Sequence, residues 1–139
     1  MTSHNLVTLV TLLSLLLFMF MIIRTGGARA KSGLKAPATT GDQMYERHFR
    51  VLMNTMEGMT VYLVSLWLFA LYWDSMIGQW IAAGLGVVWI VGRIVYMLSY
   101  VKDPEGRGPG FAITALAIVV LLVGAFSGVI HNYMSHPAA

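Results

Sequence analysis

Two long stretches of the chain contain no charged residue, and this feature limits the fold more than any other. One runs from Leu6 to Ile23 and the other from Phe111 to Ile130. A membrane-spanning helix needs about 20 mostly apolar residues to cross a hydrocarbon core of about 30 Å. Backbone groups in lipid must pair with one another, so such runs span as helices. Only 11% of the residues are charged, against about 25% in a soluble domain.

Two shorter apolar stretches complete a set of four spans. Met59–Trp73 is extended backwards by a polar stretch of helical pattern, and Ile77–Val91 continues past Arg93 to Tyr100. The connection "DSM" between them is so short that these helices must be antiparallel neighbours. The sequence therefore predicts one all-α domain over residues 1–139, an integral membrane four-helix bundle.

The other two connections differ in character. The first, "RTGGARAKSGLKAPATTGDQMY", is rich in Gly, Ala, Thr and basic residues and predicts an irregular loop. The third, "VKDPEGRGPG", contains two prolines and predicts a structured turn. Basic residues follow the first apolar run and none precedes it, whereas a secretory signal peptide has its basic residues before the apolar run. We therefore expect that the first helix is not cleaved off and remains part of the protein.

The nine Lys and Arg residues all fall on one predicted side of the membrane. They follow the first span or lie near the end of the third: Arg24, Arg29, Lys31, Lys35, Arg47, Arg50, Arg93, Lys102 and Arg107. The positive-inside rule then places both termini outside and the first and third connections in the cytoplasm. We expect a multi-pass protein of a bacterial inner membrane, with any site near these residues facing the cytoplasm.

The composition excludes several kinds of chemistry. The chain has no cysteine, which rules out disulfides, thiolate metal sites and a thiol nucleophile of its own. Any thiol chemistry must come from a substrate or cofactor. The histidines have no partners at metal-ligand spacing, so no metal is expected. No phosphate-binding glycine loop, Ser-His-Asp arrangement or nucleic-acid-binding pattern is present.

Small residues recur at four-residue spacing on two of the predicted helices. Gly78, Ala82 and Gly86 share one face of the third, and Gly124 and Gly128 share one face of the fourth. Small residues let helices approach closely inside a membrane. The spacing fits packing within the chain and contacts between subunits equally well.

A polar stripe lies directly before the second apolar run, in "ERHFRVLMNTMEG". At about 100° per residue, Glu46, Arg50, Asn54 and Glu57 fall within about 80° of one another. Glu46 and Arg50 also have the spacing of an ordinary helix ion pair, so Glu46 has two interpretations. Arg47 and His48 lie off this stripe and are expected at the lipid headgroups.

The third helix carries a matching polar face. Arg93, Tyr96 and Tyr100 share it, and the following turn adds Arg107. Ionisable groups below the membrane interface usually face a protein interior, a cavity or each other. A purely structural bridge between Arg93 and Glu57 is the alternative to a binding site. Arginines, an acid, an amide and phenols suit a zwitterionic ligand with carboxylates and an ammonium group.

The combined pattern resembles the MAPEG family, the membrane-associated proteins of eicosanoid and glutathione metabolism. That family has approximately E-R-x-x-R-x-x-x-N-x-x-E on its second helix, R-x-x-Y-x-x-x-Y on its third, and an arginine in the next turn. The resemblance covers essentially the whole chain. Every motif position is matched, at Glu46, Arg47, Arg50, Asn54, Glu57, Arg93, Tyr96, Tyr100 and Arg107.

The resemblance implies a homotrimer with glutathione sites between neighbouring subunits. It implies a catalytic role at the glutathione sulfur for Arg107, which looks like the arginine of leukotriene C synthases. A free thiol has a pKa of about 8.5, which a neighbouring cation lowers. Arg24 or Arg29 of the neighbouring subunit would supply a second cation. The residues that would hold the tripeptide are Arg50, Asn54, Glu57, Arg93, Tyr96 and Tyr100.

One position departs from the family pattern. The leukotriene-synthase type has Tyr after the motif glutamate, where this chain has Gly58. We therefore expect a general membrane glutathione transferase that conjugates lipophilic electrophiles and also reduces lipid hydroperoxides, with glutathione as co-substrate and membrane lipids around it. The alternatives are a non-catalytic lipid-binding or scaffold member of the family, which would bind glutathione without turnover, and a small multidrug transporter that depends on Glu57.

Overall fold

A computed structural model of the chain describes residues 4–136, which form four long helices. All four are long and apolar enough to cross a membrane, and no strand occurs among the described residues. The predicted all-helical architecture with four candidate spans is confirmed. The helices are α1 (Asn5–Ser32), α2 (Gln43–Tyr72), α3 (Met76–Lys102) and α4 (Gly108–Ser135), and a 3-10 turn, η1 (Pro104–Arg107), precedes α4.

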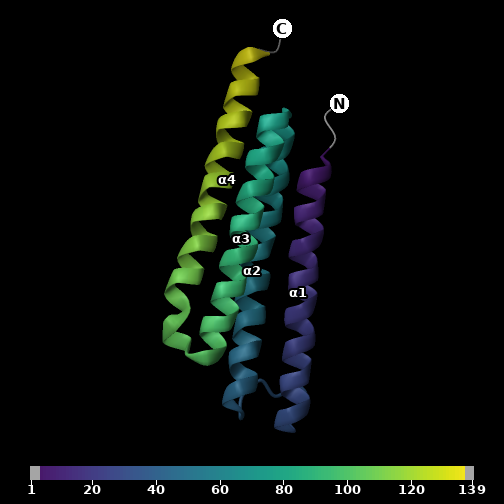
Figure 1. Cartoon of the computed structure of the whole chain (residues 1–139), viewed down its shortest axis with the longest axis vertical. Helices are drawn as coiled ribbons and strands as arrows, with labels where there is room; N and C mark the ends of the chain where they lie inside the picture. The colour runs from purple at the N-terminus through teal and green to yellow at the C-terminus, as the bar shows by residue number, and fades with distance from the viewer. Residues whose placement is uncertain (1–3, 137–139) are drawn as a thin grey trace.

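The helices run up and down beside their neighbours, with α1 and α4 on opposite sides of the α2–α3 pair (Figure 1). The α2–α3 turn lies at the end near both chain termini. The opposite end carries the connection from Ser32 to Gln43 and the turn η1. We call it the basic end, because the Lys and Arg residues gather in and beside these two connections.

At the basic end the structure differs from the expected irregular first loop. Helix α1 continues through the glycine-rich stretch to Ser32 and ends at Gly33, whose φ of 70° is the left-handed conformation that favours glycine. Helix α2 begins at Gln43, capped by Asp42, whose side chain accepts a hydrogen bond from the Tyr45 backbone N–H. The irregular segment is therefore much shorter than the composition predicted. Glycine weakens a helix only modestly, so the adjoining apolar turns carry α1 through it.

The turn between α3 and α4 has its own local determinants. Asp103 accepts a hydrogen bond from the Glu105 backbone N–H, and Pro104 occupies the first position of η1, where no backbone donor is needed. The prediction of a structured turn agrees with this geometry. Its compactness fixes Arg107 directly beside the end of α3.

The recurring small residues pack within the chain. A Cβ added to Gly86 would lie 2.3 Å from Val10 Cγ1 of α1. One added to Gly124 would lie 2.2 Å from the Phe69 ring of α2. Gly86 also makes room for the hydroxyl group of Tyr62, and the Tyr62 ring stacks on Trp89 with 4.1 Å between the ring centres. These glycines let the helices of one protomer approach closely, as small residues do in membranes.

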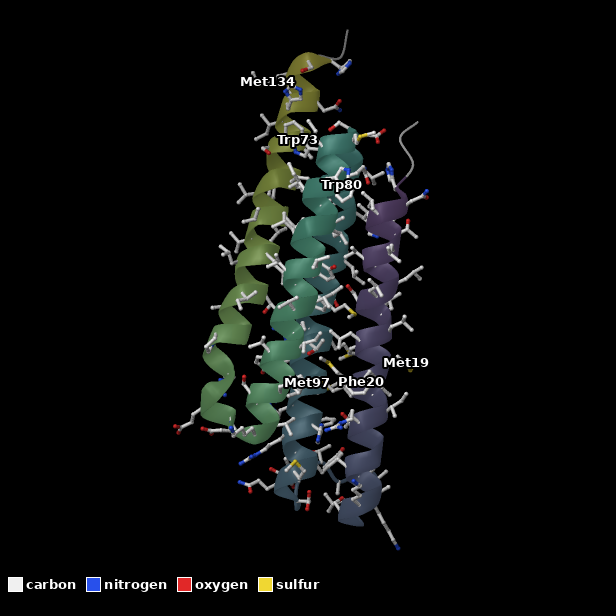
Figure 2. All side chains as sticks on the ribbon, viewed as in Figure 1. Met19, Phe20, Trp73, Trp80, Met97 and Met134 are labelled. Atoms are coloured by element: carbon white, nitrogen blue, oxygen red, sulfur yellow. The ribbon has the colours of Figure 1, made fainter. Side chains whose placement is uncertain are left out.

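The outer surface of the bundle is apolar, as lipid contact requires. Leu16 is 65% exposed and Phe126 is 69% exposed. The exposed Trp80 lies near the end that carries the termini, and the exposed Phe20 lies toward the basic end (Figure 2). The four helices are long enough to span a membrane, and their outward-facing side chains are apolar. Together these two features identify an integral membrane protein.

Candidate functional site

A pocket of about 480 Å³ opens at the basic end, where α2, α3 and the start of α4 meet. Its volume falls within the range of about 300–1,000 Å³ that is typical of small-molecule sites. Five residues that the sequence predicted for one site line it, together with a phenyl ring that the sequence analysis did not single out. The lining residues are Arg50, Asn54, Tyr96, Tyr100, Arg107 and Phe111.

Helical spacing places these side chains in pairs. Arg50 and Asn54 are one turn apart on α2, and Tyr96 and Tyr100 are one turn apart on α3. The two tyrosine rings lie 5.6 Å apart. Phe111 stands one turn after Arg107, and this i,i+4 relation is the signal that could have predicted its place in the pocket.

A glycine contact holds the start of α4 against α3. A Cβ added to Gly110 would lie 2.4 Å from the backbone nitrogen of Tyr96 and 2.6 Å from its Cα. Only glycine allows this approach of α4 to the α3 backbone. Gly110 is three residues after Arg107, so the contact fixes the distance between Arg107 and the two tyrosines.

Arg93 lies beneath the pocket and does not line it. Its side chain is 3% exposed, and its guanidinium donates to Asn54 Oδ1 at 2.9 Å and to Thr114 Oγ1 at 2.7 Å. The guanidinium carbon also lies 4.6 Å from the centre of the Tyr96 ring. Arg93 therefore joins α2, α3 and α4 and sets the orientation of two pocket residues. A direct role for Arg93 in ligand binding stays a prediction.

Glu57 lies one turn beyond Asn54 on α2 and is exposed. It does not line the pocket of its own protomer, and among residues 4–136 it forms no salt bridge. The considered Arg93–Glu57 bridge is thus absent from the described part of the chain. A Cβ added at the neighbouring Gly58 would meet nothing within 4 Å, so this face of α2 is open.

Two other residues of the polar stretch bind the backbone. Arg47 donates to the carbonyl oxygens of Val101 and Lys102, both at 2.9 Å, and so satisfies the last turn of α3. Glu46 accepts a hydrogen bond from the Gly41 N–H at 2.8 Å. Within residues 4–136, neither the Glu46–Arg50 ion pair nor an outward-facing Arg47 occurs. Sequence spacing gave no signal for Arg47, because its partners are backbone groups of a different helix.

The two candidate second cations point in different directions. Arg29 turns toward its own protomer, donating to the Ala38 carbonyl at 2.8 Å and to the Tyr45 hydroxyl. Arg24 lies in a separate groove between α1 and α3. Neither lines the pocket of its own protomer, so a contribution to the site of a neighbouring subunit stays a prediction for both.

The charged side chains that line the pocket are all positive. Arg50 and Arg107 are both exposed, no carboxylate lines the pocket, and neither arginine forms a salt bridge within the described residues. Two free guanidinium groups beside an amide and two phenols favour an anionic or zwitterionic ligand. Over residues 4–136, no three His, Asp or Glu side chains cluster in a way that could hold a metal ion.

The same chain matches a known family over most of its length. The family model of the MAPEG family matches residues 7–127. The chain is a member of the MAPEG family. The resemblance to the family is therefore confirmed.

Individual MAPEG relatives cover nearly the whole chain. An uncharacterized protein of Synechocystis is 43% identical over 88% of this chain and 86% of its own length. Mouse microsomal glutathione S-transferase 2 is 33% identical over 96% of this chain and 88% of its own. Guinea pig leukotriene C4 synthase is 29% identical over 94% of this chain and 83% of its own.

Proposed function

We propose that the protein is a membrane glutathione transferase, which joins glutathione to lipophilic electrophiles. The observation that carries the proposal is the pocket in which Arg50, Asn54, Tyr96, Tyr100 and Arg107 converge. The similarity to a microsomal glutathione S-transferase and to a leukotriene C4 synthase supports glutathione as the co-substrate.

The pocket supplies complementary groups for a zwitterionic tripeptide. Arg50 binds a carboxylate through paired N–H donors, as guanidinium groups do. Asn54 already uses its carbonyl oxygen as the acceptor for Arg93, so its amide N–H groups remain free to donate to the ligand. Glu57 does not line the pocket within one protomer, and it binds the ammonium group of a ligand that extends to the next turn of α2.

Arg107 activates the sulfur. A cation next to the glutathione thiol lowers the pKa of that thiol and raises the fraction of nucleophilic thiolate. The thiol proton leaves to solvent through the open mouth of the pocket. The thiolate then forms a carbon–sulfur bond to the electrophile, and the leaving group departs with its bonding electrons, or an epoxide ring opens to an alkoxide that takes up a proton.

The electrophile reaches the sulfur from the bilayer. Phe111 is 51% exposed and lines the pocket next to the apolar outer face of α4. This arrangement lets a lipophilic substrate stay in contact with hydrocarbon until it meets the thiolate. A lipid hydroperoxide would use the same route, with two glutathione molecules reducing it to an alcohol and water as they form glutathione disulfide.

The same proposal includes assembly and orientation. Three protomers form the functional unit, and a neighbouring subunit closes the exposed side of each pocket. The basic end faces the cytoplasm of a bacterium, where glutathione is available, and the bundle spans the inner membrane. The positive-inside distribution of Lys and Arg supports this orientation.

The central experiment compares Arg107→Ala with Lys35→Ala, a control that also removes one exposed cation but lies outside the pocket. Removing Arg107 is expected to lower conjugation of a model electrophile by about 100-fold, the usual effect of deleting one charge-stabilising group. It should also abolish the thiolate absorbance of bound glutathione. Lys35→Ala should leave both unchanged.

Three results would contradict this mechanism in different ways. Unchanged turnover in Arg107→Ala would remove that residue from catalysis. Glutathione binding without any turnover in the wild type would favour the scaffold alternative. Proton-coupled cation transport in vesicles, abolished by Glu57→Gln, would favour the transporter.

A further inference from the structure

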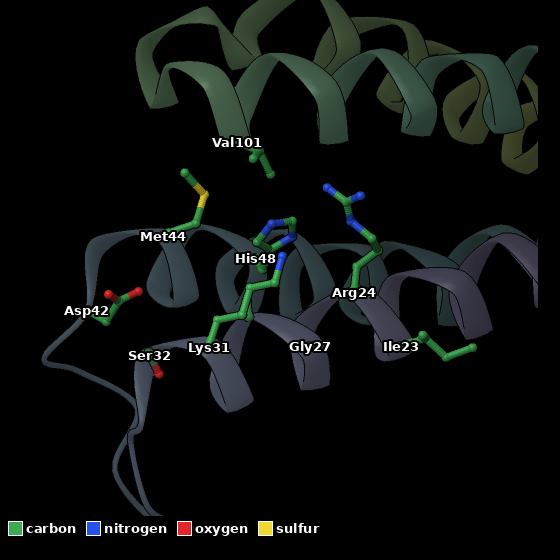
Figure 3. A pocket seen from close by; sticks show the side chains of 10 residues that line it. Ile23, Arg24, Gly27, Lys31, Ser32, Asp42, Met44, His48 and Val101 are labelled. Atoms are coloured by element: carbon green, nitrogen blue, oxygen red, sulfur yellow. The ribbon is translucent and has the colours of Figure 1, made fainter.

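A second cavity system lies at the basic end and is separate from the proposed glutathione pocket. Two adjoining cavities of about 490 and 330 Å³ share Arg24, Met44, His48 and Val101, so they form one groove between α1 and α3 over the start of α2. Figure 3 shows the Arg24 guanidinium of α1 and Val101 of α3 pointing into this space. No residue lines both this α1–α3 groove and the glutathione pocket.

The α1–α3 groove is strongly cationic. Arg24, Lys31, Arg47 and Lys102 line it, and Asp42 is the one carboxylate among its lining residues. The Asp42 side chain is already engaged as the cap of α2. Among residues 4–136, no carboxylate lies within salt-bridge distance of Arg24, Lys31 or Lys102. Several cations that face one cavity without acidic partners favour an anionic ligand there.

The walls of the groove are apolar on the side toward the bilayer. Phe20 of α1 and Leu98 of α3 line it and are 44% and 63% exposed. Val91 and Ile94 of α3 are also exposed and share the face of Leu98, because the three residues are at i, i+3 and i+7. The groove thus joins a cationic end to an apolar track that runs into the membrane.

We propose that the α1–α3 groove binds the phosphate-bearing headgroup of an anionic phospholipid, with an acyl chain along the apolar track. Basic pockets between helices on the cytoplasmic side are suited to such headgroups. Arg24 and Lys31 contact the phosphate from α1, and Lys102 contacts it from α3. The lipid ties the basic ends of α1 and α3 together. This assignment is additional to the proposed transferase function and does not depend on it.

Native mass spectrometry of the detergent-purified protein tests the assignment. The probes are phosphatidylglycerol and, as the neutral comparison, phosphatidylcholine of the same chain length. Wild type is expected to retain phosphatidylglycerol preferentially. Each cation near a headgroup contributes about a fivefold gain in affinity, so Lys31→Gln combined with Lys102→Gln should weaken phosphatidylglycerol binding by about 25-fold. Both lysines are exposed, so the fold should tolerate their replacement.

Lys35→Gln is the matched control, because Lys35 is an exposed lysine four residues after Lys31 but lies outside the groove. It should retain wild-type binding of phosphatidylglycerol. Equal binding by the double variant and the control would overturn the proposal. So would displacement by inorganic phosphate as effective as that by a short-chain phosphatidylglycerol, which would make this a site for free phosphate. Dissociation of the oligomer by the double variant would also overturn it, since the groove would then be a subunit contact.

Discussion

Two arginines of the same motif have different surroundings, and burial decides what each can do. Arg93 is almost fully buried and uses its guanidinium to hold Asn54 and Thr114. Arg107 is exposed at the mouth of the pocket and forms no salt bridge among the described residues. A charge with fixed buried partners positions its neighbours, whereas a free one remains available to a ligand. We therefore treat Arg93 as a positioning residue.

Replacing Arg93 by lysine tests this assignment. An ammonium group keeps the charge but cannot reach Asn54 and Thr114 at once with the fork geometry of a guanidinium. Losing one hydrogen bond to a charged group costs about 1.5–3 kcal/mol. We expect Arg93→Lys to raise the KM for glutathione at least tenfold, with kcat within about threefold of wild type, as measured by steady-state conjugation kinetics.

Measuring KM and kcat separately distinguishes a residue that positions the ligand from one that takes part in the reaction. Thr114→Val removes the hydrogen bond from Arg93 to Thr114 but leaves the one to Asn54 in place, and it should change KM less than Arg93→Lys does. A fall in kcat with KM unchanged in Arg93→Lys would instead assign Arg93 to the reacting atoms.

At the scale of the elements, the site depends on where two helices touch. Helix α2 supplies Arg50 and Asn54 from its polar first turns, and α3 supplies the tyrosines from its last turns. The start of helix α4 lies close to α3, and the contact of Gly110 with the Tyr96 backbone determines this distance. A shift of α4 away from α3 would widen the pocket on the side of Arg107.

Gly110→Ala is expected to cause such a shift. The added methyl group would lie well inside van der Waals distance of backbone atoms that cannot rotate away. Overpacking of this kind costs about 1–3 kcal/mol. We expect a lower melting temperature in detergent and a loss of conjugation activity of at least tenfold at temperatures where the variant is still folded.

The matched control lies two residues earlier. A Cβ added at Gly108 would meet nothing within 4 Å, so Gly108→Ala should change stability by no more than about 0.5 kcal/mol. If Gly110→Ala were as stable and active as Gly108→Ala, the Gly110 contact would not determine the position of α4.

For the whole molecule, the exposed side of α2 leads us to predict that a neighbouring subunit covers it. Glu57 lies halfway along a spanning helix and is exposed, with the open position Gly58 beside it. An ionisable side chain at this depth needs a protein surface or a cavity next to it. A neighbouring subunit is the simplest source of that surface.

We predict that the detergent-purified protein has three times the protomer mass of 15.3 kDa. Light scattering with correction for bound detergent measures this directly. Replacing Met56, which is exposed one residue before Glu57, by Trp should weaken the assembly if this face of α2 is covered by a neighbour. A monomeric wild type that still conjugates glutathione would contradict the intersubunit site.

The orientation is tested with single cysteines, for which the cysteine-free chain is a ready background. Lys35→Cys at the basic end should react with a membrane-impermeant maleimide only when the cytoplasmic face is accessible. Met76→Cys, at the exposed start of α3 near the opposite end, should react from the other face. The reverse labelling pattern would place the proposed glutathione pocket outside the cell.

The sequence alone determined the four helices and their order, and it grouped five of the six residues that line the pocket. The bilayer explains this success, because lipid demands long apolar helices and makes each polar group within them stand out. Helical periodicity then placed Arg50 and Asn54 on one face and Tyr96 and Tyr100 on another. Membership of the MAPEG family, inferred from the same positions, is confirmed by the family match.

Only the tertiary structure decided how deep each polar side chain lies and what it contacts. It placed Arg93 beneath the pocket, turned Arg47 onto the backbone of α3, and left Arg24 in a separate groove. The physical reason is that periodicity fixes the direction of a side chain around its own helix. Depth and partners depend on how close the neighbouring helices come, and that distance is set by contacts such as the one between Gly110 and Tyr96.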